Sequence, residues 1–132
     1  MVELSLRTER QSQLVDITRL VRDAVAGQSG AAALVYVPHT TAGVTINEHA
    51  DPAVARDFET ALERIVPASW AWQHVEEGEE NAPTHIRAAF MGPSVVVPLR
   101  DDGELALGTW QGIFFCEFDG PRERSVYVSV LQ

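Results

Sequence analysis

The last third of the chain holds four short apolar segments that are separated by turn sequences. The segments are SVVVPL, ELALG, TWQGIFFCEF and ERSVYVSVL, which begin at residues 94, 104, 109 and 123. Asp102-Gly103 favours a hairpin turn, and Asp119-Gly120-Pro121 favours a second turn. Strands that follow one another through short turns pair antiparallel. This region therefore predicts consecutive antiparallel strands, and it restricts the possible folds more than any other feature of the sequence.

The first part of the chain mixes strands with helices. VELSLRT, AALVYV and VTIN are typical of strands, whereas ITRLVRDAVAG and APTHIRAAFM are typical of short helices. Asp51-Pro52 predicts the start of the longest helix, because aspartate caps free amides and proline is tolerated at the first helical position; Pro67 ends it. Asn81 is a predicted cap and Gly92 a predicted end of the last helix. The order predicts an α+β fold, an antiparallel β-sandwich with a few helices packed to one side.

Length and composition exclude several classes of protein. A chain of 132 residues has the common size of one domain, so we expect a single domain over residues 1–132. No apolar stretch approaches the roughly 20 residues that span a bilayer, and MVELSLRTER does not resemble a signal peptide, so we expect a cytoplasmic protein. The net charge of −9 disfavours nucleic acid and anionic membranes as partners. All 10 basic residues are arginine, which excludes a Schiff-base or P-loop lysine. Cys116 lies in the apolar run IFFCEF and is expected to be buried.

Polar residues are concentrated in HTTAGVTINEHADP, directly after the strand AAALVYVP. His39 and Thr40 lie in the predicted turn, where a scaffold holds side chains close to solvent. Alternatively, the Thr40 hydroxyl forms a hydrogen bond only with the turn backbone, and His39 is an ordinary half-buried histidine. Asn47 and Glu48 follow on the next strand, where Glu48 is expected on the outward face. The run therefore predicts one wall of a site, with a structural alternative for each member.

Asp57 lies on the predicted long helix at the edge of its apolar stripe, three residues after Val54 and four before Ala61. A carboxylate at such a boundary is commonly a surface residue. If it faces a cleft instead, burial would raise its pKa and suit it to act as a base.

His74 and His85 flank an acidic segment, HVEEGEENAPTH, that shows no helical period in its first half. Their spacing matches no tight metal motif, and the segment lacks the pattern of a calcium loop. If His39, His74 and His85 converge, three imidazoles with an open fourth position would suit Zn²⁺, and nearby carboxylates would suit Mg²⁺. Alternatively, the glutamates between them form only a solvated loop: Glu76, Glu77, Glu79 and Glu80.

The last long apolar strand and the turn after it contain a third polar group. Gln111 points to the face opposite Trp110, so at most one of the two faces a given cleft, and Trp110 is commonly a core residue. Glu117 and Asp119 follow, and Arg122 offers a guanidinium fork for a carboxylate or phosphate. A salt bridge between Arg122 and Asp119 is an equally good interpretation.

Together these blocks resemble the YjbQ-like family, also called UPF0047, whose members are often described as secondary thiamine-phosphate synthases. The resemblance runs in order through HTTAGVTINEHADPAV, HVEEGEENAPTHI, MGPSVVVP and LGTWQGIFFCEFDGPRER. It implies a compact α+β fold with an antiparallel β-sandwich, assembled as a trimer. It also implies a polar site that draws on each block: His39, Thr40, Thr41, Asn47, Glu48, Asp51, His74, Asn81, His85, Ser94, Trp110, Gln111, Glu117, Asp119 and Arg122.

The activity that the resemblance implies joins a pyrimidine pyrophosphate to a thiazole phosphate and releases pyrophosphate. We expect a divalent cation, Mg²⁺ or Zn²⁺, a phosphorylated small-molecule substrate, and a homotrimer without nucleic-acid or membrane partners. The expected catalytic residues are His39, Thr40, Asn47, Glu48, Asp57, His74, His85, Gln111 and Arg122, and the expected metal ligands are His39, His74 and His85. Two alternatives stay open: a metal-dependent small-molecule hydrolase with a three-histidine site, and a non-catalytic trimeric module that binds a small ligand.

Overall fold

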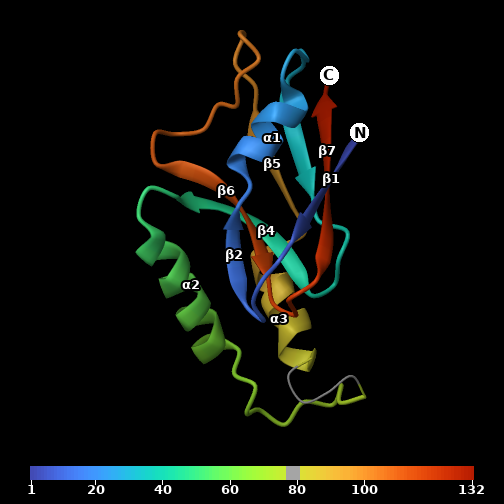
Figure 1. Ribbon diagram of the computed structural model, residues 1–132, viewed down its shortest axis with the longest axis vertical. Coiled ribbons are helices and arrows are strands. Elements are labelled where there is room, and N and C mark those ends of the chain that lie inside the picture. Colours follow the sequence, from blue (N-terminus) through green and yellow to red (C-terminus); the bar gives the residue numbers. More distant parts are fainter. Residues whose placement is uncertain (77–80) are drawn as a thin grey trace.

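The computed structural model describes residues 1–76 and 81–132, which form two antiparallel sheets and three helices (Figure 1). The strands are β1 (Val2–Arg7), β2 (Gln13–Asp16), β3 (Ala32–Tyr36), β4 (Ala42–Glu48), β5 (Ser94–Pro98), β6 (Gln111–Glu117) and β7 (Glu123–Leu131). The helices are α1 (Thr18–Val25), α2 (Pro52–Ile65) and α3 (Asn81–Met91). One sheet has the strand order β1-β7-β3-β5, and the other has the order β2-β6-β4.

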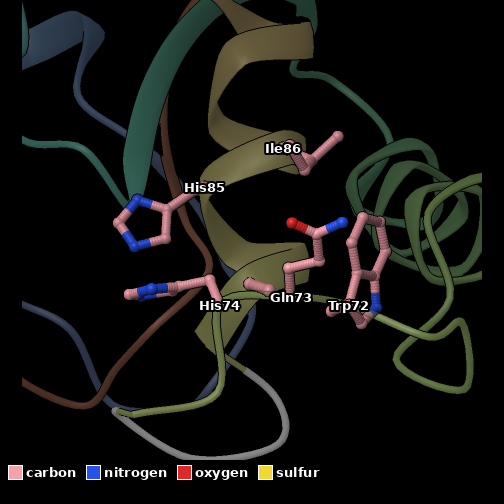
Figure 2. Close-up of a pocket in the computed structure, with 6 residues that line it drawn as sticks. Trp72, Gln73, His74, His85 and Ile86 are labelled. Carbon is pink, nitrogen blue, oxygen red and sulfur yellow. The ribbon is translucent and has the colours of Figure 1, made fainter.

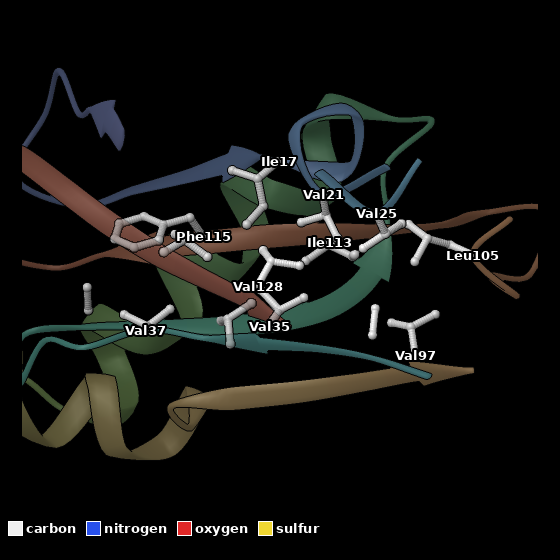
Figure 3. Close-up of a cluster of buried hydrophobic side chains, with 14 residues drawn as sticks. Ile17, Val21, Val25, Val35, Val37, Val97, Leu105, Ile113, Phe115 and Val128 are labelled. Carbon is white, nitrogen blue, oxygen red and sulfur yellow. The ribbon is translucent and has the colours of Figure 1, made fainter. Parts of the chain in front are cut away.

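The main hydrophobic core lies between the two sheets. Side chains of period two point inward from each layer, such as Val35 of β3 and Val128 of β7 from one sheet and Ile113 and Phe115 of β6 from the other. All four are almost inaccessible to solvent. Helix α1 adds Val21 and further apolar residues to the same core, as Figure 3 shows. This core holds the two sheets together and fixes which side chains reach their ends.

A second apolar cluster lies on the outer face of the three-stranded sheet. Phe114 and Cys116 project from β6 on this face, and Leu62 of α2 and Ala88 of α3 pack against them. Burial raises the pKa of the Cys116 thiol to about 12, so this cysteine is an inert core residue, as predicted. Helices α2 and α3 are therefore anchored to the strands that carry most of the polar residues of interest.

The structure confirms the predicted α+β class and most of the predicted elements. Asp51 caps α2 as predicted, since its Oδ1 accepts a hydrogen bond of 2.9 Å from the backbone N–H of Ala53. Helix α1 contacts strands of both sheets, whereas α2 and α3 lie against the three-stranded one (Figure 1). No helix in residues 1–76 and 81–132 is long and apolar enough to cross a membrane.

Two strand predictions differ from the structure. Strand β2 was not expected, because its sequence QLVD has no clear period. Its extended conformation is stabilised instead by antiparallel pairing with β6. ELALG was expected to be a strand, but only an isolated antiparallel bridge between Leu99 and Leu105 forms there. The turn at Asp102-Gly103 is present, and the chain beyond Leu105 turns away before a ladder can extend. Glu77, Glu79 and Glu80 of the predicted acidic connection lie outside the described residues.

We expect Phe115→Ala to lower the free energy of unfolding by about 3–5 kcal/mol, because it leaves a cavity between the sheets. Phe90→Ala is the matched control, since the Phe90 side chain is 62% exposed and should change stability by less than about 0.5 kcal/mol. Urea unfolding followed by circular dichroism measures both. Equal effects of the two substitutions would contradict the placement of the core.

Candidate functional site

Two histidines share one side-chain acceptor at the start of helix α3. The Oδ1 atom of Asn81 lies 2.7 Å from Nε2 of His74 and 3.0 Å from Nε2 of His85. His85 comes one turn after Asn81 on the same face of α3, and His74 reaches them from the preceding loop. The two imidazole rings meet edge to face with their centroids 5.1 Å apart (Figure 2). The structure thus brings together two of the three predicted histidines.

The hydrogen bonds of Asn81 define which ring nitrogens carry protons. Its amide nitrogen donates to Oδ2 of Asp119 over 3.3 Å. The opposite amide orientation would place the oxygen against that carboxylate, so the observed one is favoured. An amide oxygen only accepts hydrogen bonds, and both His74 and His85 must therefore donate to it through Nε2–H. In the neutral form of each ring, the lone pair is then on Nδ1.

The turn after β6 holds the far end of this arrangement. Arg122 donates from Nη2 to Oδ2 of Asp119 over 2.9 Å and from Nε to the Asp119 carbonyl over 2.8 Å. The predicted salt bridge between these two residues is therefore present. A guanidinium, a carboxylate, an amide and two imidazoles form one connected polar group, which we call the His74–His85 cluster: His74, Asn81, His85, Asp119 and Arg122.

His39 lies on the other side of His85. A pocket of about 390 Å³ is lined by both histidines, by Thr40 and by small side chains of α3. Nε2 of His39 accepts a hydrogen bond of 3.0 Å from the backbone N–H of Ser125 in β7. Burial lowers the pKa of His39, and the positive charge of Arg124 lowers it further. His39 is therefore kept neutral, with its proton on Nδ1.

Close packing of α3 on β4 places His85 beside this pocket. Gly43 of β4 lies so near the end of α3 that a Cβ there would come within 2.7 Å of the Gly92 carbonyl oxygen. The backbone N–H of Val44 donates to the same oxygen over 3.0 Å. A larger residue at position 43 would push the helix, and with it His85, away from His39.

A buried ion pair between the two sheets stabilises the segments that carry the site. Glu117 of β6 and Arg124 of β7 are 0% and 4% exposed, and they join the two sheets. Nε of Arg124 donates to Oε2 of Glu117 over 2.7 Å, and its Nη2 donates to Oγ1 of Thr41 over 2.8 Å. Burial alone would raise the pKa of Glu117, but hydrogen bonds from Arg124, the Asp119 backbone and Thr8 hold it below its ordinary value. The pair therefore stays charged and orders the backbone that carries Asp119.

Other predicted residues lie at the opposite end of the sheet. Glu48 pairs with Gln111 at the far end of the β4–β6 ladder, six residues beyond Ala42, which is about 20 Å along a strand. Asn47 precedes Glu48 and accepts its backbone N–H, and Asp57 is exposed on α2. The structure does not bring these four residues to the three histidines within one chain. The histidine pockets lie at the start of β4, whereas Asn47, Glu48 and Gln111 lie at its other end.

The remaining residues that the resemblance implied lie in different parts of the structure. Thr41 is buried against Arg124, and Ser94 pairs with Tyr36 where β5 begins, next to the His39 pocket. Trp110 is 64% exposed, so its interpretation as a core residue is wrong.

The three histidines do not form the predicted metal centre in this arrangement. Nε2 of His74 and of His85 donates to Asn81, and Nε2 of His39 accepts from Ser125. A metal ion on Nδ1 of His39 would leave a proton on its Nε2, facing the Ser125 N–H. Within residues 1–76 and 81–132, no group of three or more His, Cys, Asp or Glu side chains is placed to hold a metal ion. These residues therefore do not fit a three-histidine zinc site.

Comparison with known proteins assigns the family. The family model described as "UPF0047 protein YjbQ-like" matches residues 2–132. The chain belongs to this YjbQ-like family. A YjbQ-like relative, a UPF0047 protein of Methanocaldococcus jannaschii, is 43% identical over 96% of this chain and 90% of its own. YugU of Bacillus subtilis is 42% identical over 97% of this chain and 96% of its own.

Solved YjbQ-like structures have the same fold. A crystal structure of a YjbQ/UPF0047 protein from Clostridium acetobutylicum has a TM-score of 0.92 and 47% identity, and covers 99% of this chain and 100% of its own. The crystal structure of a hypothetical protein from Aeropyrum pernix has a TM-score of 0.91 at 37% identity, and this match covers 98% of this chain and 96% of that chain. The expected α+β sandwich of the YjbQ-like family is thereby confirmed.

Arg124 is the supporting residue that sequence reasoning missed. The signal was present, because the alternation of ERSVYVSVL places Arg124 on the same inward face as Val126 and Val128. A charged residue at a core position of a strand indicates a buried partner, which here is Glu117.

We expect Arg124→Met to lower the free energy of unfolding by about 3–5 kcal/mol, because it leaves Glu117 as a buried carboxylate without a counter-charge. Arg7→Met is the control: the Arg7–Glu123 pair is 3.7 Å long and largely exposed, and its loss should cost at most about 1 kcal/mol. Chemical denaturation distinguishes the two. A small loss with Arg124→Met would show that the pair is not a structural support.

The lowered pKa of His39 predicts a defined pH dependence of stability. The unfolded chain takes up the His39 proton near the ordinary pKa of about 6.5, whereas the folded chain takes it up only at lower pH. This contribution is therefore complete above about pH 6.5 and is lost as the pH falls towards the folded pKa.

His39→Gln tests this assignment, because a glutamine oxygen can accept the Ser125 N–H without titrating. We expect the loss of stability between about pH 7.5 and about pH 5.5, on either side of the ordinary histidine pKa, to be smaller in the variant. Urea unfolding at the two pH values measures it. An unchanged pH dependence would refute the assignment to His39.

Proposed function

We propose that this chain is a transferase for a phosphorylated small molecule that carries a planar ring. The specific reaction that we propose joins a pyrimidine pyrophosphate to a thiazole phosphate and yields thiamine phosphate and pyrophosphate. The observation that carries the proposal is the His74–His85 cluster, in which two imidazoles border an apolar pocket and are linked through Asn81 and Asp119 to the Arg122 guanidinium. Such a combination suits a ligand with a flat apolar part and an anionic part.

The pocket beside the cluster has a polar side and an apolar side. It has a volume of about 360 Å³, and its lining includes Trp72, Ile86 and Ala82 together with the two histidines (Figure 2). The indole of Trp72 is held in place, because its Nε1–H donates to the Pro67 carbonyl over 3.1 Å. An aromatic ring of a substrate would pack against Trp72 and direct its charged group towards the histidines.

The reaction forms one bond and breaks one bond. The thiazole nitrogen supplies an electron pair to the methylene carbon of the pyrimidine, and the bond from that carbon to the pyrophosphate oxygen breaks with its electrons on oxygen. Catalysis then requires donors that stabilise the charge on the departing pyrophosphate. When protonated, His85 can donate a second N–H from Nδ1. The Arg122 guanidinium, paired with Asp119, belongs to the same hydrogen-bonded cluster.

A divalent cation enters this proposal only as a companion of the pyrophosphate group. Its charge would assist the departure of pyrophosphate, as is usual for such leaving groups. We assign it no ligands among the histidines, because their hydrogen bonding does not fit a shared metal ion.

Purified protein incubated with the two phosphorylated precursors and Mg²⁺ should form thiamine phosphate. His85→Ala should reduce the rate by about 10²–10⁴-fold, the usual contribution of a proton-transferring side chain. Asp23→Asn, which alters an exposed residue of α1 outside both pockets, is the control and should leave the rate unchanged. Chromatography of the product measures all three proteins.

Each outcome bears on the proposal. Product in the wild type that is lost in His85→Ala supports the reaction and the site together. Binding of the precursors without turnover would replace the transferase with a binding module. Turnover that His85→Ala leaves intact would place the chemistry elsewhere in the chain.

A further inference from the structure

A second polar pocket lies between strand β2 and the start of helix α2, at the other end of β4 from the His74–His85 cluster. It has a volume of about 350 Å³, and His49, Asp16 and Arg56 contribute its polar lining. Leu14, Ala55 and Phe114 contribute apolar lining. None of these residues belongs to the site described above, so nothing in this pocket depends on the proposed transferase reaction.

His49 is held in this pocket by contacts from three sides. Its backbone N–H donates to the Trp110 carbonyl over 3.0 Å and so continues the β4–β6 ladder. Its ring lies directly over Gly112, where an added Cβ would come within 2.5 Å of Cγ and Nδ1 of the imidazole. Its Nδ1 lies 2.9 Å from Oδ2 of Asp16. The ring therefore has a fixed position, and only a glycine at position 112 allows it.

The contacts of Asp16 assign the proton on His49. Oδ1 of Asp16 accepts hydrogen bonds from the backbone N–H and the hydroxyl of Thr18, at 3.0 and 2.6 Å. The hydroxyl oxygen of Thr18 accepts from the backbone N–H of Ile113 over 2.8 Å, so its own proton is directed to Asp16. Burial opposes ionisation of Asp16, but the bonds from Thr18 and His49 prevail and lower its pKa. An ionised Asp16 requires His49 to donate from Nδ1, which leaves Nε2 as the unused atom of the ring.

The carboxylates of the pocket are already engaged. Oε1 of Glu59 accepts from Nη2 of Arg10 over 3.1 Å and from the Leu14 N–H over 3.0 Å. Oδ1 of Asp51 accepts from the Ala53 N–H, and Asp16 is bonded as described. The negative groups of this surface are thus paired with donors from the protein itself.

Two basic side chains of the pocket, His49 and Arg56, have unused hydrogen-bonding capacity, whereas Arg10 is paired with Glu59. Among residues 1–76 and 81–132, Nε2 of His49 has no hydrogen-bond partner, and the Arg56 guanidinium has neither a hydrogen bond nor an ion pair. The carboxylates are engaged, whereas the Nε2–H of a His49 imidazolium and the Arg56 guanidinium are not, so the pocket is suited to a ligand that brings acceptors, which is an oxyanion. The adjacent apolar lining is suited to a hydrophobic body attached to that anion.

We propose that this pocket is a second ligand site, which binds a small organic phosphate through protonated His49 and Arg56. Asp16 compensates the charge of the imidazolium, whose Nε2–H donates to a phosphate oxygen while Arg56 supplies the second cationic donor. The organic part of the ligand packs on Leu14, Ala55 and Phe114. The phosphate group is the recognised chemistry, and the apolar body distinguishes an organic phosphate from the free ion.

The test uses inorganic phosphate and phenyl phosphate as probes of the folded chain. We expect both to shift the NMR resonances of the His49 ring and of the Gly112 amide, and phenyl phosphate to bind more tightly. His49→Ala and Arg56→Ala should each weaken binding of phenyl phosphate by about tenfold or more. Arg64→Ala, in the last turn of the same helix and outside this pocket, should leave the affinity unchanged.

Three results would overturn the proposal. The first is the absence of resonance shifts at His49 with either probe. The second is equal loss of affinity in Arg64→Ala and Arg56→Ala, which would indicate only general attraction of anions. The third is tighter binding of inorganic phosphate than of phenyl phosphate, which would exclude the apolar contact. Because the assay involves neither His74 nor His85, its outcome is independent of the thiamine-phosphate assay.

Discussion

The ion pair between Glu117 and Arg124 is the contact on which the candidate site depends. It crosses from the central strand of one sheet to a central strand of the other, and both side chains are removed from solvent. Burying two charges is costly. The structure compensates the cost with hydrogen bonds that Thr8 and the backbone after Glu117 donate to the carboxylate, and with one that Thr41 accepts from Arg124. Replacement of either partner would leave a charge in the core. The pair therefore constrains the segments that converge at this end of the sandwich.

Those segments are the ones that carry the chemistry. Thr41 lies two residues after His39, the Asp119 backbone N–H binds Glu117, and Ser125, which holds His39, follows Arg124. One end of the hydrophobic core is thus continuous with the polar site. The His39 ring is orientated by the backbone of β7, which cannot move unless the sheets also separate. The position of His39 is consequently a property of the fold rather than of a loop.

The sequence predicted the local structure better than the placement of the site. Consecutive apolar strands and the Asp51-Pro52 helix start were recognisable because each follows from a local rule. Strand β2 was not, because its pairing with β6 is long-range and leaves no period in QLVD. The polar residues of HTTAGVTINEHADP were expected in one site. The middle of this motif is an extended strand, however, which separates the polar residues before it from those at its far end. The polar residues at the two ends of this strand therefore lie about 20 Å apart. His49 shows the same limitation, since its partner Asp16 belongs to the strand that no pattern predicted.

Both pockets depend on the pairing of one strand, β4, with β6. Ala42, Val44 and Ile46 face the core, while Gly43 faces α3, and the two ends of the same strand lead to His39 and to His49. A slip of one residue in this pairing would reverse every side chain and expose the apolar set. It would also disassemble both pockets at once. An insertion within β4 would therefore change both pockets at the same time, whereas the irregular segment from Glu104 to Gly108 lies outside the β4–β6 pairing.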